Sequence, residues 1–159
     1  MASLLLFLLL PSLFCTSLSD PLSLKSLSAY DVLKSYNFPI GLLPKGALGY
    51  DLDPTTGKFS AYFNGTCSFS IESYQIRYQS TISGTISTNH LSNLHGISVK
   101  VLLFWININE VIRTENDLEF SVGIASADFP IDNFYVCPQC GCGLNCDGVG
   151  GVLKLRSIV

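Results

Sequence analysis

The sequence is poor in charge and contains no basic run. Only 13% of the 159 residues are charged, the formal net charge is -3, and no lysine or arginine stands next to another. Nucleic acids and anionic membrane surfaces are attracted by clustered positive charge. The sequence therefore predicts no nucleic acid partner and no general attraction to anionic lipid.

No apolar stretch is long enough to span a bilayer, which takes about 20 residues. The N-terminal run from Leu4 to Phe14 is interrupted by Pro11 and is followed by the small residues Ser17 and Ser19. This pattern is typical of a cleaved secretory signal peptide, although no Lys or Arg precedes the run and an uncleaved anchor is the alternative. We expect secretion, and no transmembrane span in the mature protein.

Catalytic motifs are missing as well. The sequence has no G-x-S-x-G, S-x-x-K or H-E-x-x-H pattern, and its only histidines are His90 and His95 in the polar segment "TNHLSNLHG". Exposed loop histidines explain this segment, and a His95 and Ser98 pair is the one nucleophile hypothesis that the spacing allows. We assign no catalytic residue, metal or cofactor, and the sequence favours a protein that is not an enzyme.

Short strands separated by turn residues fill most of the chain. Alternation in "YQIRYQ" puts Tyr74, Ile76 and Tyr78 on one face, and a helix capped by Ser28 precedes Pro39. The other predicted strands are "ALGYDL", "KFSAYF", "CSFSI", "TISGTIS", "ISVKVLLFWININ" and "LEFSVGI". In "VLLFWINI" the alternation disappears, which predicts a central strand covered on both faces.

This pattern predicts a mainly β fold, an antiparallel pseudobarrel or two-sheet sandwich of short strands with one short N-terminal helix. The length after processing suits one domain. We expect a signal peptide at 1–19, a linker at 20–28, the β pseudobarrel at 29–136 and a Cys/Gly-rich tail at 137–159.

Four quoted stretches carry a resemblance to a known family. In order they are "GLLPKGALGYDLDPTTGKFSAYF", "ISGTIS", "LSNLHGISVKVLLFWININEV" and "LEFSVGIASADFPIDNF". Over Tyr30 to Phe134 the chain resembles the plant family called domain of unknown function 538. The resemblance implies a β pseudobarrel likened to half of a tubular lipid-binding protein, and a function in binding apolar ligands or in hydrolysing esters such as chlorophyll or methylated pectin. A plant origin places secretion in the apoplast or cell wall.

An apolar interior of this size is either filled by its own side chains or hollow enough for a ligand. We expect a non-catalytic module that binds a lipid or other apolar ligand, with a carboxylic ester hydrolase and a wall-associated protein-binding module as alternatives. The candidate ligand-binding residues are the aromatic Tyr62, Tyr74, Tyr78, Phe104 and Trp105.

Carboxylate pairs have a structural explanation. Asp51 and Asp53 lie two positions apart, and Asp53 precedes the turn "PTTG", where its side chain can accept hydrogen bonds from the turn backbone. Glu115, Asp117 and Glu119 belong to "TENDLE", which is typical of a solvated hairpin tip. We expect neither group to form a catalytic or calcium site.

The C-terminal segment holds four cysteines, Cys137, Cys140, Cys142 and Cys146. Their C-x2-C-x-C-x3-C spacing leaves a shorter loop than structural zinc sites usually have, so metal binding and a redox-active thiol are the alternatives to disulfides. In an oxidising compartment disulfides are expected, either Cys137–Cys140 with Cys142–Cys146 or Cys137–Cys142 with Cys140–Cys146. Cys67 is then the odd thiol of the mature chain, and a protein partner could use the cross-linked tail.

Asn64 begins the sequence "NGT", an acceptor for N-glycosylation in a secreted protein. It lies between two predicted strands, where Asn-Gly also favours a tight turn. We therefore predict an exposed turn and glycosylation at Asn64.

Overall fold

The computed structural model describes residues 27–71 and 73–143, so the predicted signal peptide at 1–19 lies outside the described residues. The elements in order are α1 (Ala29–Ser35), the 3-10 turn η1 (Ile40–Leu42), β1 (Ala47–Leu52), β2 (Lys58–Phe63), β3 (Cys67–Ile71), β4 (Tyr74–Ser87), β5 (His90–Val101), β6 (Phe104–Asn107), β7 (Glu110–Arg113), β8 (Asp117–Ser121), β9 (Ser126–Pro130) and η2 (Ile131–Phe134). Of the described helices, none has the length and apolar character that crossing a membrane requires.

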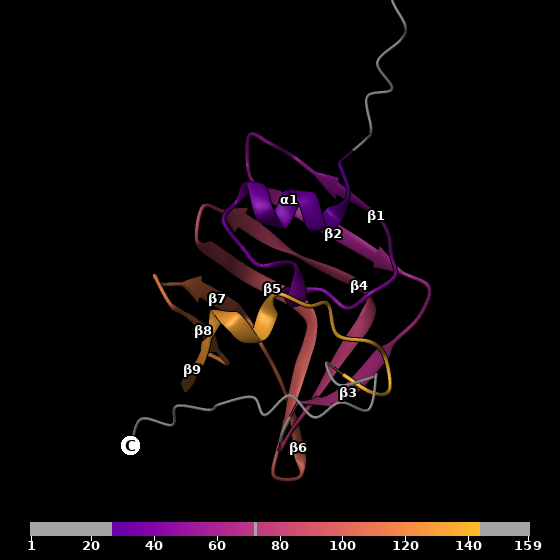
Figure 1. Ribbon diagram of the computed structural model, residues 1–159, viewed down its shortest axis with the longest axis vertical. Coiled ribbons are helices and arrows are strands. Elements are labelled where there is room, and N and C mark those ends of the chain that lie inside the picture. The colour runs from indigo at the N-terminus through magenta and orange to yellow at the C-terminus, as the bar shows by residue number, and fades with distance from the viewer. Residues whose placement is uncertain (1–26, 72, 144–159) are drawn as a thin grey trace, which may run out of the picture.

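Two long strands, β4 and β5, organise the sheet (Figure 1). Strand β2 pairs with the half of β4 near Thr81–Thr85, whereas β3 pairs with the half at Tyr74–Tyr78. Likewise β7 pairs with the start of β5, and β6 with its end. The antiparallel order β1-β2-β4-β5-β7-β8-β9 does not close on itself. These observations confirm the predicted mainly β class with one helix.

The β4–β5 hairpin bends because its register shifts at bulges. Gly96 has a φ of +90°, and a Cβ there would collide with the carbonyl oxygen of Thr81. Only glycine accepts both the left-handed backbone and this close approach. The bend turns the inner faces of the two halves toward a common interior.

Helix α1 covers that interior at one end of the molecule (Figure 1). Its start confirms the predicted cap, because the Ser28 hydroxyl accepts from the Asp31 backbone N–H at 3.2 Å and the Asp31 carboxylate accepts from the Ser28 N–H at 3.0 Å. Ala29, Val32 and Leu33 are buried against the sheet, where Ile82 and Leu118 are almost fully buried. The short helix therefore covers one end of the hydrophobic core.

The prediction for residues 101–108 is wrong. The run is not a central strand covered on both faces: β5 ends at Val101, Leu102 and Leu103 form a turn, and the chain returns as β6. The hairpin reaches the end of the molecule opposite α1 (Figure 1). Leu102, Leu103 and Phe104 are exposed. Loss of alternation was caused here by an apolar turn rather than by burial on both faces.

The opposite end of β5 is a polar turn formed by Thr88 and Asn89. Asn89 has a φ of +64°, a conformation that asparagine tolerates well. Its N–H donates to the Tyr36 carbonyl, its carbonyl accepts from the Arg113 N–H, and its side chain accepts from the Asn37 amide at 2.7 Å. Arg113 also donates to the backbone and side-chain oxygens of Asn37. This turn is thereby joined to α1 and β7.

Candidate functional site

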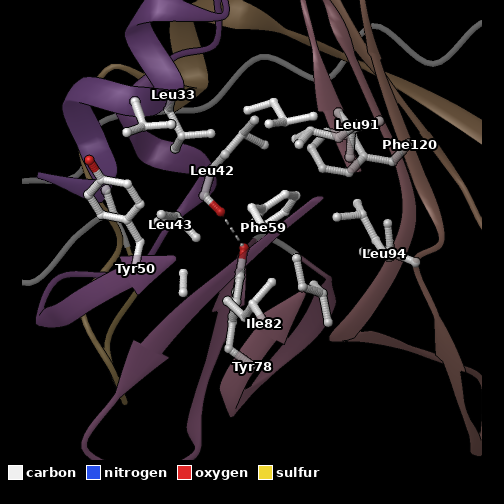
Figure 2. Close-up of a pocket in the computed structure, with 17 residues that line it drawn as sticks. Leu33, Leu42, Leu43, Tyr50, Phe59, Tyr78, Ile82, Leu91, Leu94 and Phe120 are labelled. Atoms are coloured by element: carbon white, nitrogen blue, oxygen red, sulfur yellow. Dashed lines mark hydrogen bonds between the residues drawn. The ribbon is translucent and has the colours of Figure 1, made fainter. Parts of the chain in front are cut away.

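A small apolar cavity of about 50 Å³ lies between α1 and the inner face of the sheet (Figure 2). It is lined by Ala29, Val32, Leu33, Leu42, Leu43, Tyr50, Phe59, Ala61, Tyr78, Ile82, Ile86, Leu91, Leu94, Ile97, Ile108, Val111 and Phe120. These residues come from α1, from the chain around η1, and from strands β1, β2, β4, β5, β7 and β8 or the segments beside them. The cavity is therefore a property of the whole domain.

The buried hydroxyl group among the cavity-lining residues already has a hydrogen-bond partner. The buried Tyr78 hydroxyl donates to the Leu42 carbonyl at 3.2 Å (Figure 2), and burial raises the pKa of Tyr78 far above its ordinary value. Throughout the described ranges, every buried side-chain nitrogen or oxygen has a hydrogen-bond partner. An apolar cavity of this kind stays dry and favours apolar occupants.

A surface groove adjoins the cavity where α1 begins. Its walls are residues 27–29 and the strand β1, and its volume is about 660 Å³. Ala29 and Tyr50 line both spaces, so the groove and the interior cavity meet at these two residues. Leu48 and Asp51 both line the groove, which gives it mixed apolar and polar walls.

The predicted aromatic candidates do not form one site. Tyr78 lines the cavity, but the other four do not. Tyr62 is exposed and donates to Asp51 at 2.6 Å, and Tyr74 makes an edge contact with Phe129. Phe104 and Trp105 lie on the β5–β6 hairpin. Alternation in the sequence identifies side chains that face inward. It does not predict where the core leaves a cavity, as it does beside small residues such as Ala61.

Comparison with known families assigns most of the described residues to one family. The family model described as "Protein of unknown function, DUF538" matches residues 29–135, more than half of the chain. The chain belongs to this family. The match coincides almost completely with the predicted pseudobarrel at 29–136. Since the family description names no activity, the function of this DUF538 domain has to be argued from its own residues.

One curated relative is an uncharacterized protein of Arabidopsis thaliana, At5g01610. It is 25% identical over 95 residues, which cover 59% of this chain and 55% of the relative. The matched part is thus only about half of the relative's length. The similarity supports membership of the plant DUF538 family and carries no substrate or partner.

The histidines of the DUF538 domain lie on strand β5, so their predicted place in a loop is wrong. His90 Nε2 is 2.6 Å from Glu110 Oε1 in a half-exposed pair. His95 is exposed opposite Ser83, and Ser98 lies opposite Arg77. Within the described residues no hydroxyl or thiol hydrogen-bonds to either imidazole. The structure does not join His95 and Ser98 into a nucleophile and base.

The carboxylates take the structural roles expected of them. Asp53 accepts from the Thr56 hydroxyl at 2.7 Å and the Thr55 N–H at 2.9 Å, and these hydrogen bonds lower its pKa. Asp51 accepts from Tyr62, which raises the pKa of that phenol. The group Glu115, Asp117 and Glu119 lies on the β7–β8 hairpin. Across residues 27–71 and 73–143, no three metal-ligating side chains gather into a metal site.

The pairings predicted for Cys137 and Cys140 are wrong, whereas the predicted Cys142–Cys146 pair extends outside the described residues. Cys140 is bonded to Cys67, 73 residues away, with a Cα–Cα distance of 5.0 Å. Cys137 is a free thiol that donates to the Ile40 carbonyl, and burial raises its pKa. Cys142 is disulfide-bonded to a partner outside the described residues, where Cys146 also lies. Local spacing could not reveal that a distant strand brings Cys67 beside Cys140.

The described part of the predicted tail, residues 137–143, lies on the domain. The Lys45 N–H donates to the Pro138 carbonyl, and the Gly141 N–H donates to the Ser68 carbonyl on β3. With the disulfide, these bonds hold the segment along β3. Removing it would uncover part of the fold, so it does not act as an independent appendage.

The sequon at Asn64 lies in the turn between β2 and β3. Asn64, Gly65 and Thr66 are all exposed, so an oligosaccharide would meet no obstacle from the described residues. The turn is confirmed, whereas glycosylation stays a prediction.

Proposed function

We propose that this DUF538 domain is a secreted, non-catalytic module that binds a lipid with a single aliphatic chain. The observation that carries the proposal is the apolar cavity beneath α1, which lies beside a larger surface groove. A hydrophobic chain end would occupy the cavity, and the rest of the ligand would lie in the groove.

The cavity volume restricts what can enter. At about 50 Å³ it is a third of the engineered cavity of about 150 Å³ that accepts benzene. It therefore suits the last few carbons of a chain rather than a ring system or a whole lipid. An empty cavity of this volume costs roughly 1 kcal/mol at about 24 cal/mol per Å³, and a ligand that fills it would recover that free energy.

The groove supplies the remaining contact. Its apolar side chains include Leu48 and Leu52, and its polar groups include Asp51 and Ser28. Apolar surface buried there would contribute at about 25 cal/mol per Å² before the cost of association. Movement of Tyr50 or of the start of α1 at Ala29 would join the two spaces. These features favour an amphiphile over a wholly apolar molecule.

The proposal is tested by titrating the purified secreted protein with cis-parinaric acid, a fluorescent fatty acid. Ala61→Val adds two methyl groups to a buried wall of the cavity, where a β-branched residue suits strand β2. Ala127→Val makes the same change at an exposed strand position and serves as the control. We expect wild type and Ala127→Val to bind and Ala61→Val to lose binding while its melting temperature is kept or raised.

Two outcomes would contradict the proposal. One is wild-type protein that leaves the fluorescence of the probe unchanged. The other is Ala61→Val protein that binds the probe as tightly as wild type, because the cavity would then be a packing void without a role in binding.

A further inference from the structure

The tip of the β5–β6 hairpin exposes three consecutive large apolar side chains. Leu102 is 87% exposed, Leu103 84% and Phe104 71%, and Val101 before them is also exposed. Single exposed apolar residues are ordinary, but a contiguous group at a projecting tip marks an interaction surface. The hairpin lies at the opposite end of the molecule from α1 (Figure 1), and α1 lines the cavity.

Backbone geometry makes the leucines more unusual. Leu102 has a φ of +55°, and the other non-glycine residues with positive φ in the described ranges are all asparagines. Two turn residues with positive φ only at the first are the pattern of a type II′ turn, which favours glycine at that position. Leucine is strained at this position, so local backbone preference does not explain why Leu102 is there. Departures from local preference of this kind are expected at functional sites.

Directly behind the tip lie Lys100, Trp105 and Arg77, one aromatic and two cationic side chains that we call the collar. Lys100 and Trp105 are cross-strand partners, one position further from the turn than Val101 and Phe104. The Arg77 guanidinium carbon is 3.8 Å from the centroid of the Trp105 ring. Indole rings and long cationic side chains favour the boundary between lipid headgroups and hydrocarbon.

We propose that this hairpin inserts into the surface of a phospholipid bilayer. Leu102, Leu103 and Phe104 enter the outer hydrocarbon, while Trp105 and the cations Lys100 and Arg77 lie at the level of the headgroup phosphates. The net charge of -3 gives no general attraction to anionic lipid, so the apolar tip drives binding and phosphatidylcholine suffices. The inference concerns a separate surface and does not depend on the cavity.

A second copy of the chain is a poorer occupant of the tip. Two hairpins meeting tip to tip would bring both cationic collars together and would bury only a few side chains. Stable protein interfaces bury about 1,200 Å² or more in total. A bilayer, in contrast, accepts a small protruding tip without shape complementarity.

The test is flotation of the full secreted protein with phosphatidylcholine vesicles. The variant Leu102→Gly/Leu103→Asn removes the two leucines of the tip and supplies residues that a type II′ turn favours, so the variant folds at least as well. Ile124→Ser is the matched control, because Ile124 is an exposed apolar residue between β8 and β9, outside both the hairpin and the groove. We expect wild type and Ile124→Ser to float with vesicles, and partition of the double variant to fall about tenfold or more.

The single tryptophan provides a second readout, since Trp105 is the only one in the chain. On binding, its fluorescence should shift to the blue and be quenched by phosphatidylcholine brominated near the glycerol end of the acyl chains. Absence of vesicle binding by wild type, equal binding by the double variant, or tip-dependent dimers that ignore vesicles would each overturn the proposal. Parinaric acid binding by the double variant reports on the cavity separately.

Discussion

Strand β5 begins after one two-residue turn and ends in another, and the two turns have opposite chemistry. Thr88 and Asn89 form the first, which is polar and hydrogen-bonded to α1 and β7 through Tyr36, Asn37 and Arg113. Leu102 and Leu103 form the second, which is apolar and projects into solvent. Each turn has one residue with a positive φ, but asparagine occupies that place in the first and leucine in the second.

The difference indicates that the residues of the first turn stabilise the fold, whereas those of the second do not. Asparagine at a left-handed position satisfies local backbone preference and also makes tertiary hydrogen bonds. Leucine at such a position lowers stability and exposes apolar surface. In the first turn, backbone preference and tertiary hydrogen bonding favour the same residue. The second turn has a leucine at a left-handed position and exposes apolar side chains, and departures of this kind are expected at functional sites.

The largest predicted effect is a loss of stability in β3 and in the part of β4, Tyr74 to Tyr78, that pairs with it. This part of the molecule lies toward the apolar turn rather than toward the polar one. The Cys67→Ser/Cys140→Ser variant removes the disulfide that holds residues 138–143 against β3. Loss of a bridge closing a long loop lowers the free energy of unfolding by roughly 2–5 kcal/mol. Chemical denaturation measures this loss, and hydrogen exchange should show the greatest loss of protection in β3.

Cys137→Ser is the control for that variant, since Cys137 is a free thiol in the same segment. It should change stability much less. If Cys137→Ser and the double variant were equally destabilised, packing of the segment rather than the disulfide would hold β3.

Asn89→Leu gives the polar turn the chemistry of the apolar one. It places leucine at a left-handed position and removes the hydrogen bond from Asn37, so the free energy of unfolding should fall by roughly 2 kcal/mol. Thermal unfolding and denaturant titration measure the change. Asn89→Gly keeps the backbone freedom and should lose less; equal losses would show that the side-chain hydrogen bond alone matters.

Leu102→Gly makes the reverse change at the apolar turn. Relief of the strained φ should raise the free energy of unfolding by about 0.5–1 kcal/mol, after allowance for the greater freedom of glycine in the unfolded chain. Leu103→Ser, at a position without a positive φ, should leave stability nearly unchanged. A destabilised Leu102→Gly protein would mean that the leucine packs on the fold.

The smallest effect concerns pH and the turn between β1 and β2. The Thr56 and Thr55 hydrogen bonds lower the pKa of Asp53 in the folded protein. In the unfolded protein the pKa of Asp53 is near 3.9, so its lower pKa in the folded protein stabilises the fold above that pH. This stabilisation is lost as the pH falls through the pKa of the folded protein. The protection factor of the Thr55 amide, which is its intrinsic exchange rate divided by the measured rate, should fall in acid and should not change with pH in Asp53→Asn. An acid response in that variant would contradict the assignment.

Much of the fold follows from local sequence. The strands at 47–52, 58–63 and 67–71 coincide with β1, β2 and β3 because alternation and turn residues agree there. Ser28 and Asp31 mark the start of α1 for the same reason, since a capping box is a local motif. The Asp53 turn was predictable because its hydrogen bonds reach only three residues along the chain.

Features that depend on distant contacts were not predictable. The apolar run at 101–108 fits a buried strand and an exposed hairpin equally well, because hydrophobicity alone does not say which surface it meets. The Cys67–Cys140 bridge depends on the path of the chain after β9. The cavity depends on how α1 sits over the sheet, and only Tyr78 among the predicted ligand-binding residues reaches it.

The long separation of Cys67 from Cys140 has a consequence for biogenesis. Translation adds about 5–20 residues per second, so the 73 residues between the two cysteines take roughly 4–15 s to appear. Throughout that interval β3 lacks the segment that later lies along it, and an uncovered strand edge is a template for pairing with other chains. If the protein follows the proposed secretion route, this strand edge stays uncovered until residue 140 reaches the oxidising lumen.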